Sequence, residues 1–103
     1  MTTQLPNMGT RESIVVSFDF SRESAAVSGA VFDVWAEGQI AQDPTPLNII
    51  DGAAEIDGSN PAVVLQRISN VKDSTNYRIQ CTVNTIEGDT LTCPVILPAR
   101  LKL

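Results

Sequence analysis

Three clustered carboxylates are the first side chains in this sequence whose spacing could support chemistry. Asp51, Glu55 and Asp57 fall within seven residues of one another, beside two glycines. Carboxylate oxygens are the ligands that a hard cation such as calcium prefers. Their spacing does not match the calcium-binding loop that joins two paired helices, and Asp-Gly steps are ordinary turn sequences. We therefore expect turns in this region and no bound metal.

The two cysteines raise the question of metal or redox chemistry. Cys81 and Cys93 lie twelve residues apart on segments predicted to be facing strands. Two thiols are too few for a four-ligand zinc site. A cross-strand disulfide fits the spacing, whereas a reducing compartment and the absence of other staples favour two buried free thiols. We expect free thiols.

The remaining catalytic chemistry is limited by composition. The chain has no histidine, which removes the usual general base and the usual partner of a nucleophilic serine or cysteine. Its glycines are single and dispersed, so no glycine-rich phosphate loop follows a strand. We therefore expect a protein that is not an enzyme and that carries no cofactor.

Charge and hydropathy bound the class of partner. The 103 residues carry a net charge of −5, and the seven Lys and Arg residues are scattered along the chain. Binding to phosphate backbones needs a clustered basic surface, so nucleic acid is not an expected partner. No stretch approaches the ~20 apolar residues of a membrane span, and the first residues lack the pattern of a signal peptide. We expect synthesis and retention in a cytoplasm, with no membrane partner.

Residues 76–97 carry the strongest structural pattern, a β-hairpin. Apolar residues occupy alternate positions in both halves, which is typical of half-buried strands. Both inward sets are odd-numbered, so the loop should contain an odd number of residues, most simply three around Gly88. Gly88 should then adopt a positive φ. The expected inward residues are Tyr77, Ile79, Cys81, Val83, Leu91, Cys93, Val95 and Leu97.

Two earlier segments also alternate. The first predicts a strand with Ile14, Val16, Phe18 and Phe20 inward, and the second places Ala30, Phe32, Val34 and Ala36 inward. In the second segment Val31 and Trp35 fall on the outer face. Either a bulge shifts the register and buries Trp35, or Trp35 marks a contact surface, because tryptophan is enriched at interface anchors.

The middle of the chain is rich in turn signals. Apolar residues on either side of Asp51-Gly52 predict two short strands joined by a tight turn. The segment 62–69 predicts a further strand, with either Val63 and Leu65 or Val64 and Ile68 inward. About seven short β-runs without a helical period indicate an all-β protein, an antiparallel β-sandwich with Greek-key connections.

Tyr77 favours the immunoglobulin-like version of that sandwich. It opens a strand four residues after Asp73, which is similar to the tyrosine corner of immunoglobulin-like domains, where the hydroxyl bonds to upstream backbone. An ordinary core aromatic at the start of a strand would give the same pattern. The antibody disulfide is not implied, because Ile79 stands where its cysteine would follow.

Between Ile14 and Leu97 the chain resembles a family of small virion proteins. The segments VSFDFS, VLQRIS and YRIQCTVNTIEGDTL, with an apolar last strand, are similar to tailed-bacteriophage proteins of the fiber-tail adaptor or neck type. The signature includes the tyrosine strand, Thr85, Gly88 and the return strand. The resemblance implies one Ig-like domain, over residues 12–98, between a flexible N-terminal arm (1–11) and a C-terminal tail (99–103).

The same resemblance implies a function. It predicts a non-enzymatic structural protein of the virion, assembled in the host cytoplasm, that joins other tail, neck or capsid proteins in a symmetric multi-copy set. Edge strands and terminal arms can make such contacts. A capsid decoration protein of similar fold, or a carbohydrate-binding module using Trp35, are the alternatives. The expected contact residues are Val31, Trp35, Arg100, Leu101 and Leu103, and the expected structural residues are Tyr77, Cys81, Gly88 and Cys93.

Overall fold

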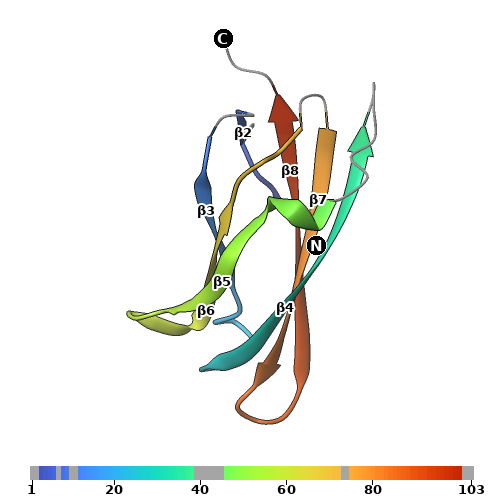
Figure 1. The fold of residues 1–103 in the computed structure, drawn as a ribbon. Helices are drawn as coiled ribbons and strands as arrows, with labels where there is room; N and C mark the ends of the chain where they lie inside the picture. The colour runs from blue at the N-terminus through green and yellow to red at the C-terminus, as the bar shows by residue number, and fades with distance from the viewer. Residues whose placement is uncertain (1–2, 7, 10–11, 39–45, 73–74, 101–103) are drawn as a thin grey trace.

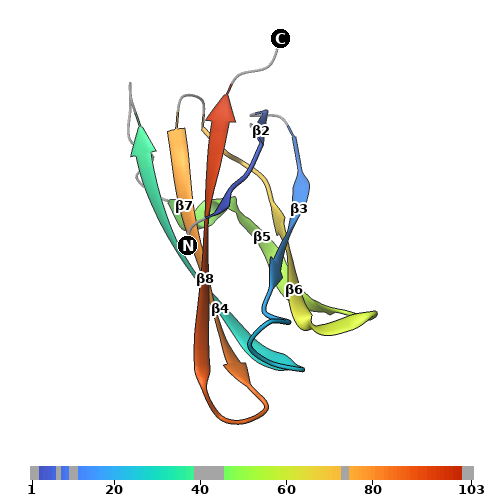
Figure 2. The same ribbon diagram turned by 180° about the vertical axis from the view of Figure 1, so that it is seen from behind.

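The computed structural model describes residues 3–6, 8–9, 12–38, 46–72 and 75–100. These residues form two β-sheets that pack face to face (Figures 1 and 2). The elements are β1 (Thr3–Gln4), β2 (Met8–Gly9), β3 (Ile14–Asp19), β4 (Val27–Gly38), the 3₁₀ helix η1 (Pro46–Ile49), β5 (Ile50–Asp57), β6 (Asn60–Ile68), β7 (Thr75–Thr85) and β8 (Thr90–Arg100).

The order of the strands identifies the type of sandwich. One sheet has the order β1-β8-β7-β4, with β2 also paired to β8, and the other has the order β3-β6-β5. Immunoglobulin-like sandwiches place their third, sixth and seventh strands on one sheet and their second, fourth and fifth on the other. Here β4, β7 and β8 take the first set of places and β3, β5 and β6 the second. The prediction of an all-β, Ig-like sandwich is confirmed.

The alternation of β3 decides which of its faces is buried. Val16, Phe18 and Phe20 are buried and Ile14 is half-buried, whereas Val15 between them is half-exposed. The rings of Phe18 and Phe32 lie 5.6 Å apart between their centroids, so this face meets β4 of the other sheet. The inward sets predicted for both segments are confirmed, because period-2 alternation matches the pleat.

The β7–β8 hairpin has the predicted parity, and its register settles the choice that the sequence left open by placing Cys81 directly opposite Cys93. Tyr77 pairs with Leu97 and Cys81 with Cys93. The Thr85 amide donates to the Asp89 carbonyl at 2.8 Å, so a three-residue loop, 86–88, joins the strands. Gly88 has a φ of 95° in that loop, a conformation that favours glycine.

The middle of the chain differs from the prediction of two short strands. Pro46–Ile49 is a 3₁₀ helix and Ile50–Asp57 is one strand, β5. Asp51-Gly52 is therefore not a tight turn but an irregularity within β5, where the pairing with β6 shifts and Gly52 has a φ of 76°. The Asp-Gly step predicted a turn, but a bulge of this kind uses the same glycine, because both structures require a positive φ.

Strand β6 resolves the choice that its sequence left open. Val64 and Ile68 are fully buried, so their parity faces the core, and Val63 on the other face is also largely covered. Gln66 has the same parity as Val64 and Ile68 and is buried with them. The core therefore includes the polar side chain of Gln66, which the apolar pattern did not predict.

Two short strands within the predicted N-terminal arm, β1 and β2, are part of a sheet. β1 and β2 run parallel to β8, with Thr3 opposite Val95 and Met8 opposite Ala99. Met8 and Ala99 are buried, so the contacts of the sandwich extend beyond the predicted bounds at residues 12 and 98. β1 and β2 belong to the sandwich because a backbone edge and an apolar groove together hold even a two-residue strand.

Candidate interaction surfaces

The outer face of the β4–β7–β8 sheet carries the predicted contact residues Val31 and Trp35. Their side chains are 60% and 48% exposed. The pairing of β4 with β7 shifts between Ser28 and Val31, and Gly29 has a φ of 65° there. A bulge is present, but it lies before Trp35 and leaves the ring exposed, so the alternative in which a bulge buries Trp35 is wrong, and a role of Trp35 in contacts stays a prediction.

Arg78 joins Trp35 on this face. The two residues are register partners on β4 and β7, and the guanidinium carbon lies 5.8 Å from the centroid of the Trp35 ring. A cation over an exposed tryptophan contributes about 0.5–1 kcal/mol. The arginine holds one ring face in place and adds a charge beside it. We call Val31, Trp35 and Arg78 the Trp35 cluster.

The neighbours of the Trp35 cluster across the sheet are mixed in polarity. Ile96 of β8 is opposite Arg78, and Gln80 of β7 lies between Asp33 and Pro94. Protein interfaces are enriched in Trp and Arg anchors surrounded by such mixed contacts. Sequence reasoning missed Arg78, because only the cross-strand register brings it to Trp35.

The other predicted contact residues are at the end of β8. Arg100 ends that strand, opposite Gly9 of β2. Its side chain, and Leu101 and Leu103, lie outside the described residues, so their roles stay predictions.

The predicted structural residues are in the β7–β8 hairpin and its entry. The Tyr77 ring is fully buried, and its hydroxyl accepts a hydrogen bond of 2.9 Å from the Lys72 amide. This is the tyrosine corner of an Ig-like domain. Tyr77 therefore ties the segment before β7 to the core.

Both cysteines are free thiols, as predicted. Cys81 is fully buried and Cys93 is half-buried. Burial raises the pKa of Cys81 to about 12, and the neighbouring Cys93 adds to the shift. Burial also raises the pKa of Cys93. Since the thiolate is the nucleophile, neither residue is activated for chemistry at neutral pH.

Two of the three carboxylates considered for calcium, Asp51 and Asp57, make hydrogen bonds to nearby serines. Asp51 accepts a hydrogen bond of 3.1 Å from the Ser69 hydroxyl. Asp57 accepts bonds from the Ser59 amide and hydroxyl, which lower the pKa of that aspartate. Within the part of the chain that the structure describes, no three acidic or thiol side chains gather as a metal site.

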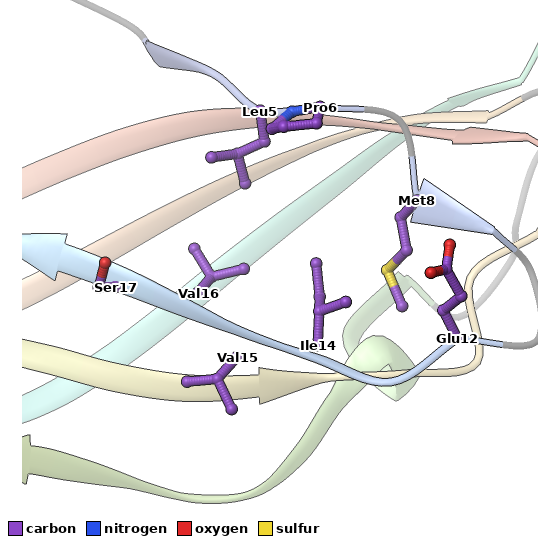
Figure 3. A pocket seen from close by; sticks show the side chains of 8 residues that line it. All are labelled: Leu5, Pro6, Met8, Glu12, Ile14, Val15, Val16 and Ser17. Atoms are coloured by element: carbon purple, nitrogen blue, oxygen red, sulfur yellow. The ribbon is translucent and has the colours of Figure 1, made fainter.

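An apolar groove of about 300 Å³ opens between the N-terminal strands and β3 (Figure 3). Ile14 and Val16 point from β3 toward Leu5, whereas Val15 points to the opposite face of the sheet. Met8 closes one end beside Glu12. The groove lies where one sheet ends and the other begins, so it follows an open side of the sandwich.

A second groove, of about 470 Å³, lies between β4 and β5 and includes Gln66 in its wall. The Gln66 amide nitrogen donates to the carbonyls of Asp51 and Gly52, both at 3.2 Å. Its Oε1 has no hydrogen-bond partner among the described residues. The same nitrogen also donates to the Arg67 carbonyl. These hydrogen bonds compensate for the burial of the Gln66 amide and hold the bulge in β5 in place.

Among the described residues, no helix has the length and apolar character needed to cross a membrane. No protein-family model matches the chain, and no curated protein matches it.

Proposed function

We propose that this chain is a non-enzymatic structural protein of a tailed-bacteriophage virion, an adaptor that joins components of the tail or neck. The observation that carries the proposal is the Trp35 cluster. Val31 and Trp35 are exposed on the outer face of the β4–β7–β8 sheet, Arg78 lies over the Trp35 ring, and both Trp and Arg are common anchors of protein interfaces. An apolar anchor of this kind fits a protein that is covered by its neighbours after assembly.

The Ig-like sandwich and the family resemblance of residues 14–97 support the same proposal. A rigid sandwich with unpaired sheet edges offers flat faces and backbone groups to neighbouring proteins. We propose no catalytic role. The chain has no histidine to act as a base, and burial raises the pKa of both thiols, which keeps them protonated at neutral pH.

The first test is the position of the chain in purified virions. A tagged copy should appear by electron microscopy at the neck or tail, in a small fixed number of copies. Hundreds of copies over the capsid surface would exclude the adaptor role and would instead show a decoration protein.

The second test is the Trp35→Ala variant, with Val15→Ala as a matched control, because Val15 is also half-exposed but lies on the other sheet. We expect Trp35→Ala to keep the native circular-dichroism spectrum and lose incorporation into virions, and Val15→Ala to keep both. Normal incorporation of Trp35→Ala would contradict the proposed anchor. Binding to a glycan array that disappears in Trp35→Ala would show the carbohydrate-binding alternative.

A further inference from the structure

Strand β3 is an open edge of the three-stranded sheet. Within the described residues it pairs with β6 alone, in an unbroken register from Ile14 opposite Ile68 to Asp19 opposite Val63. Figures 1 and 2 show β3 at the outside of the molecule, with the N-terminal strands on the other sheet. The place beside β3 is therefore open to another strand.

The register shows which backbone groups point toward that open place. The Phe20 amide donates to the Ala62 carbonyl at 2.9 Å, which extends the β3–β6 register by one pair. In an antiparallel ladder, hydrogen-bonded pairs alternate with non-hydrogen-bonded pairs. Even-numbered residues of β3 therefore bond to β6, and the N–H and C=O groups of Val15, Ser17 and Asp19 point outward.

An apolar surface follows the same edge. Ile14 and Val16 line the groove between β3 and the N-terminal strands, and Val15 on the outer face is 50% exposed. A strand placed beside β3 would cover this groove and satisfy the outward backbone groups. Both effects favour association, because apolar surface is removed from water and the unpaired backbone groups of the edge gain hydrogen-bond partners.

Edge β5 at the other side of the same sheet is less suited to pairing. Its register with β6 shifts twice, and its outer face carries Asp51 and Glu55, both exposed. A second strand of the same chain would bring like charges together there, which is unfavourable across strands.

The charges beside β3 are instead complementary to a second copy of β3. Arg67 of β6 donates to the Ser13 hydroxyl at 3.1 Å, so its guanidinium lies at the start of β3. Asp19 is exposed at the other end of β3. In an antiparallel pair of β3 strands, the aspartate of each copy comes next to the arginine of the other.

We propose that β3 pairs antiparallel with β3 of a second copy across a two-fold axis, joining two three-stranded sheets into one. Val15 lies opposite the partner's Ser17, and Ser13 lies opposite the partner's Asp19. All four are odd-numbered residues, whose backbone N–H and C=O groups point away from β6. This register also places the partner's Asp19 beside Arg67. The two apolar grooves then close against each other. The pairing needs only a second copy of this chain and leaves the Trp35 cluster uncovered, so it stands apart from the proposed adaptor contacts.

Charge exchange in the purified full chain tests the register. The native chain should show a monomer–dimer equilibrium by analytical ultracentrifugation between about 1 µM and 1 mM. Asp19→Arg or Arg67→Glu should each weaken the dimer about tenfold at low salt, since each contact occurs twice. The double variant should recover most of the native affinity. A native chain that stays monomeric at 1 mM, or a double variant as weak as the single ones, would overturn the proposal.

Backbone and cross-linking variants test the edge itself. Ser17→Pro removes an outward N–H and leaves the pairing to β6 intact, so it should abolish the dimer while circular dichroism stays native; Trp35→Ala should leave the dimer unchanged. In a Cys93→Ser background, a mixture of Val15→Cys and Ser17→Cys chains should oxidise to a disulfide-linked heterodimer faster than either chain alone. Dimers that survive Ser17→Pro, or that disappear in Trp35→Ala, would place the interface elsewhere.

Discussion

Replacing Gly88 by alanine tests the backbone account of the β7–β8 hairpin. Gly88 has a φ of 95° in the loop 86–88. A Cβ added at this position would meet no atom within 4 Å. The cost of the substitution is therefore backbone strain without a steric clash.

The expected magnitude follows from that strain. An L-residue with a methyl side chain in the left-handed region costs about 1–2 kcal/mol. A domain of about 100 residues loses roughly 4–8 °C of melting temperature per kcal/mol. We therefore expect Gly88→Ala to melt about 4–16 °C below the native chain.

Gly58→Ala is the matched control. Gly58 is also a turn glycine whose added Cβ would meet nothing within 4 Å, but its φ lies outside the positive region. Alanine there restricts the unfolded chain and should be neutral or stabilise by up to about 1 kcal/mol.

Urea unfolding followed by circular dichroism measures both variants. Gly88→Ala should lower the midpoint without changing the slope, because the surface exposed on unfolding is the same. Equal midpoints for Gly88→Ala and Gly58→Ala would refute the reasoning, since they differ in φ and not in available space.

Three further outcomes follow from buried and hydrogen-bonded groups. Tyr77→Phe removes the acceptor of the Lys72 amide and should lower the free energy of unfolding by about 1–1.5 kcal/mol in urea titrations; no change would contradict the tyrosine corner. Cys81, whose pKa is raised to about 12, should resist thiol reagents at neutral pH in the native chain and react fully in denaturant. The pKa of Glu87 is lowered by hydrogen bonds from the Glu87 amide and from the hydroxyls of Thr85 and Ser24. Ionised Glu87 therefore stabilises the folded chain above the ordinary pKa of a glutamate, and this contribution is lost as the pH falls through the lowered pKa. The destabilisation by Ser24→Ala should therefore be larger at neutral pH than at about pH 2; equal losses would contradict it.

The parts of the fold that alternate with period 2 were predictable from sequence. β3, β7 and β8 each bury one face, and burial on one face fixes both the pattern and the register. Gly88 was predictable because two odd inward sets require an odd loop, which the structure confirms at residues 86–88.

The bulge in β5 was not predictable from local sequence. Asp51-Gly52 is a strong turn signal, and the contact that makes it a bulge comes from Gln66, fourteen residues beyond Gly52. The strand pairing of residues 3–9 was also missed, because two-residue strands are too short to show a period and their attachment to β8 is made by backbone groups.

The candidate site was predictable in part. The parity of β4 placed Val31 and Trp35 outside, and the structure confirms their exposure. Arg78 was missed because the bulge between Ser28 and Val31 changes the register by which β4 meets β7. A strand pattern shows which face a residue occupies, whereas its neighbour across the sheet depends on irregularities that the pattern does not reveal.

The parallel pairing of the first strands with the last one has a consequence for the order of folding. Thr3 meets Val95 and Met8 meets Ala99, so β1 and β2, which are made before the rest of the sandwich, find their partners only after the β7–β8 hairpin has emerged. Contacts between such distant positions form late, because the intervening chain must be ordered first. Until then Met8 and the part of β3 that lines the groove, Ile14 and Val16, lack the cover that the N-terminal strands give them on β8. During synthesis, the nascent chain therefore exposes this open edge and its apolar groove until β8 has been made.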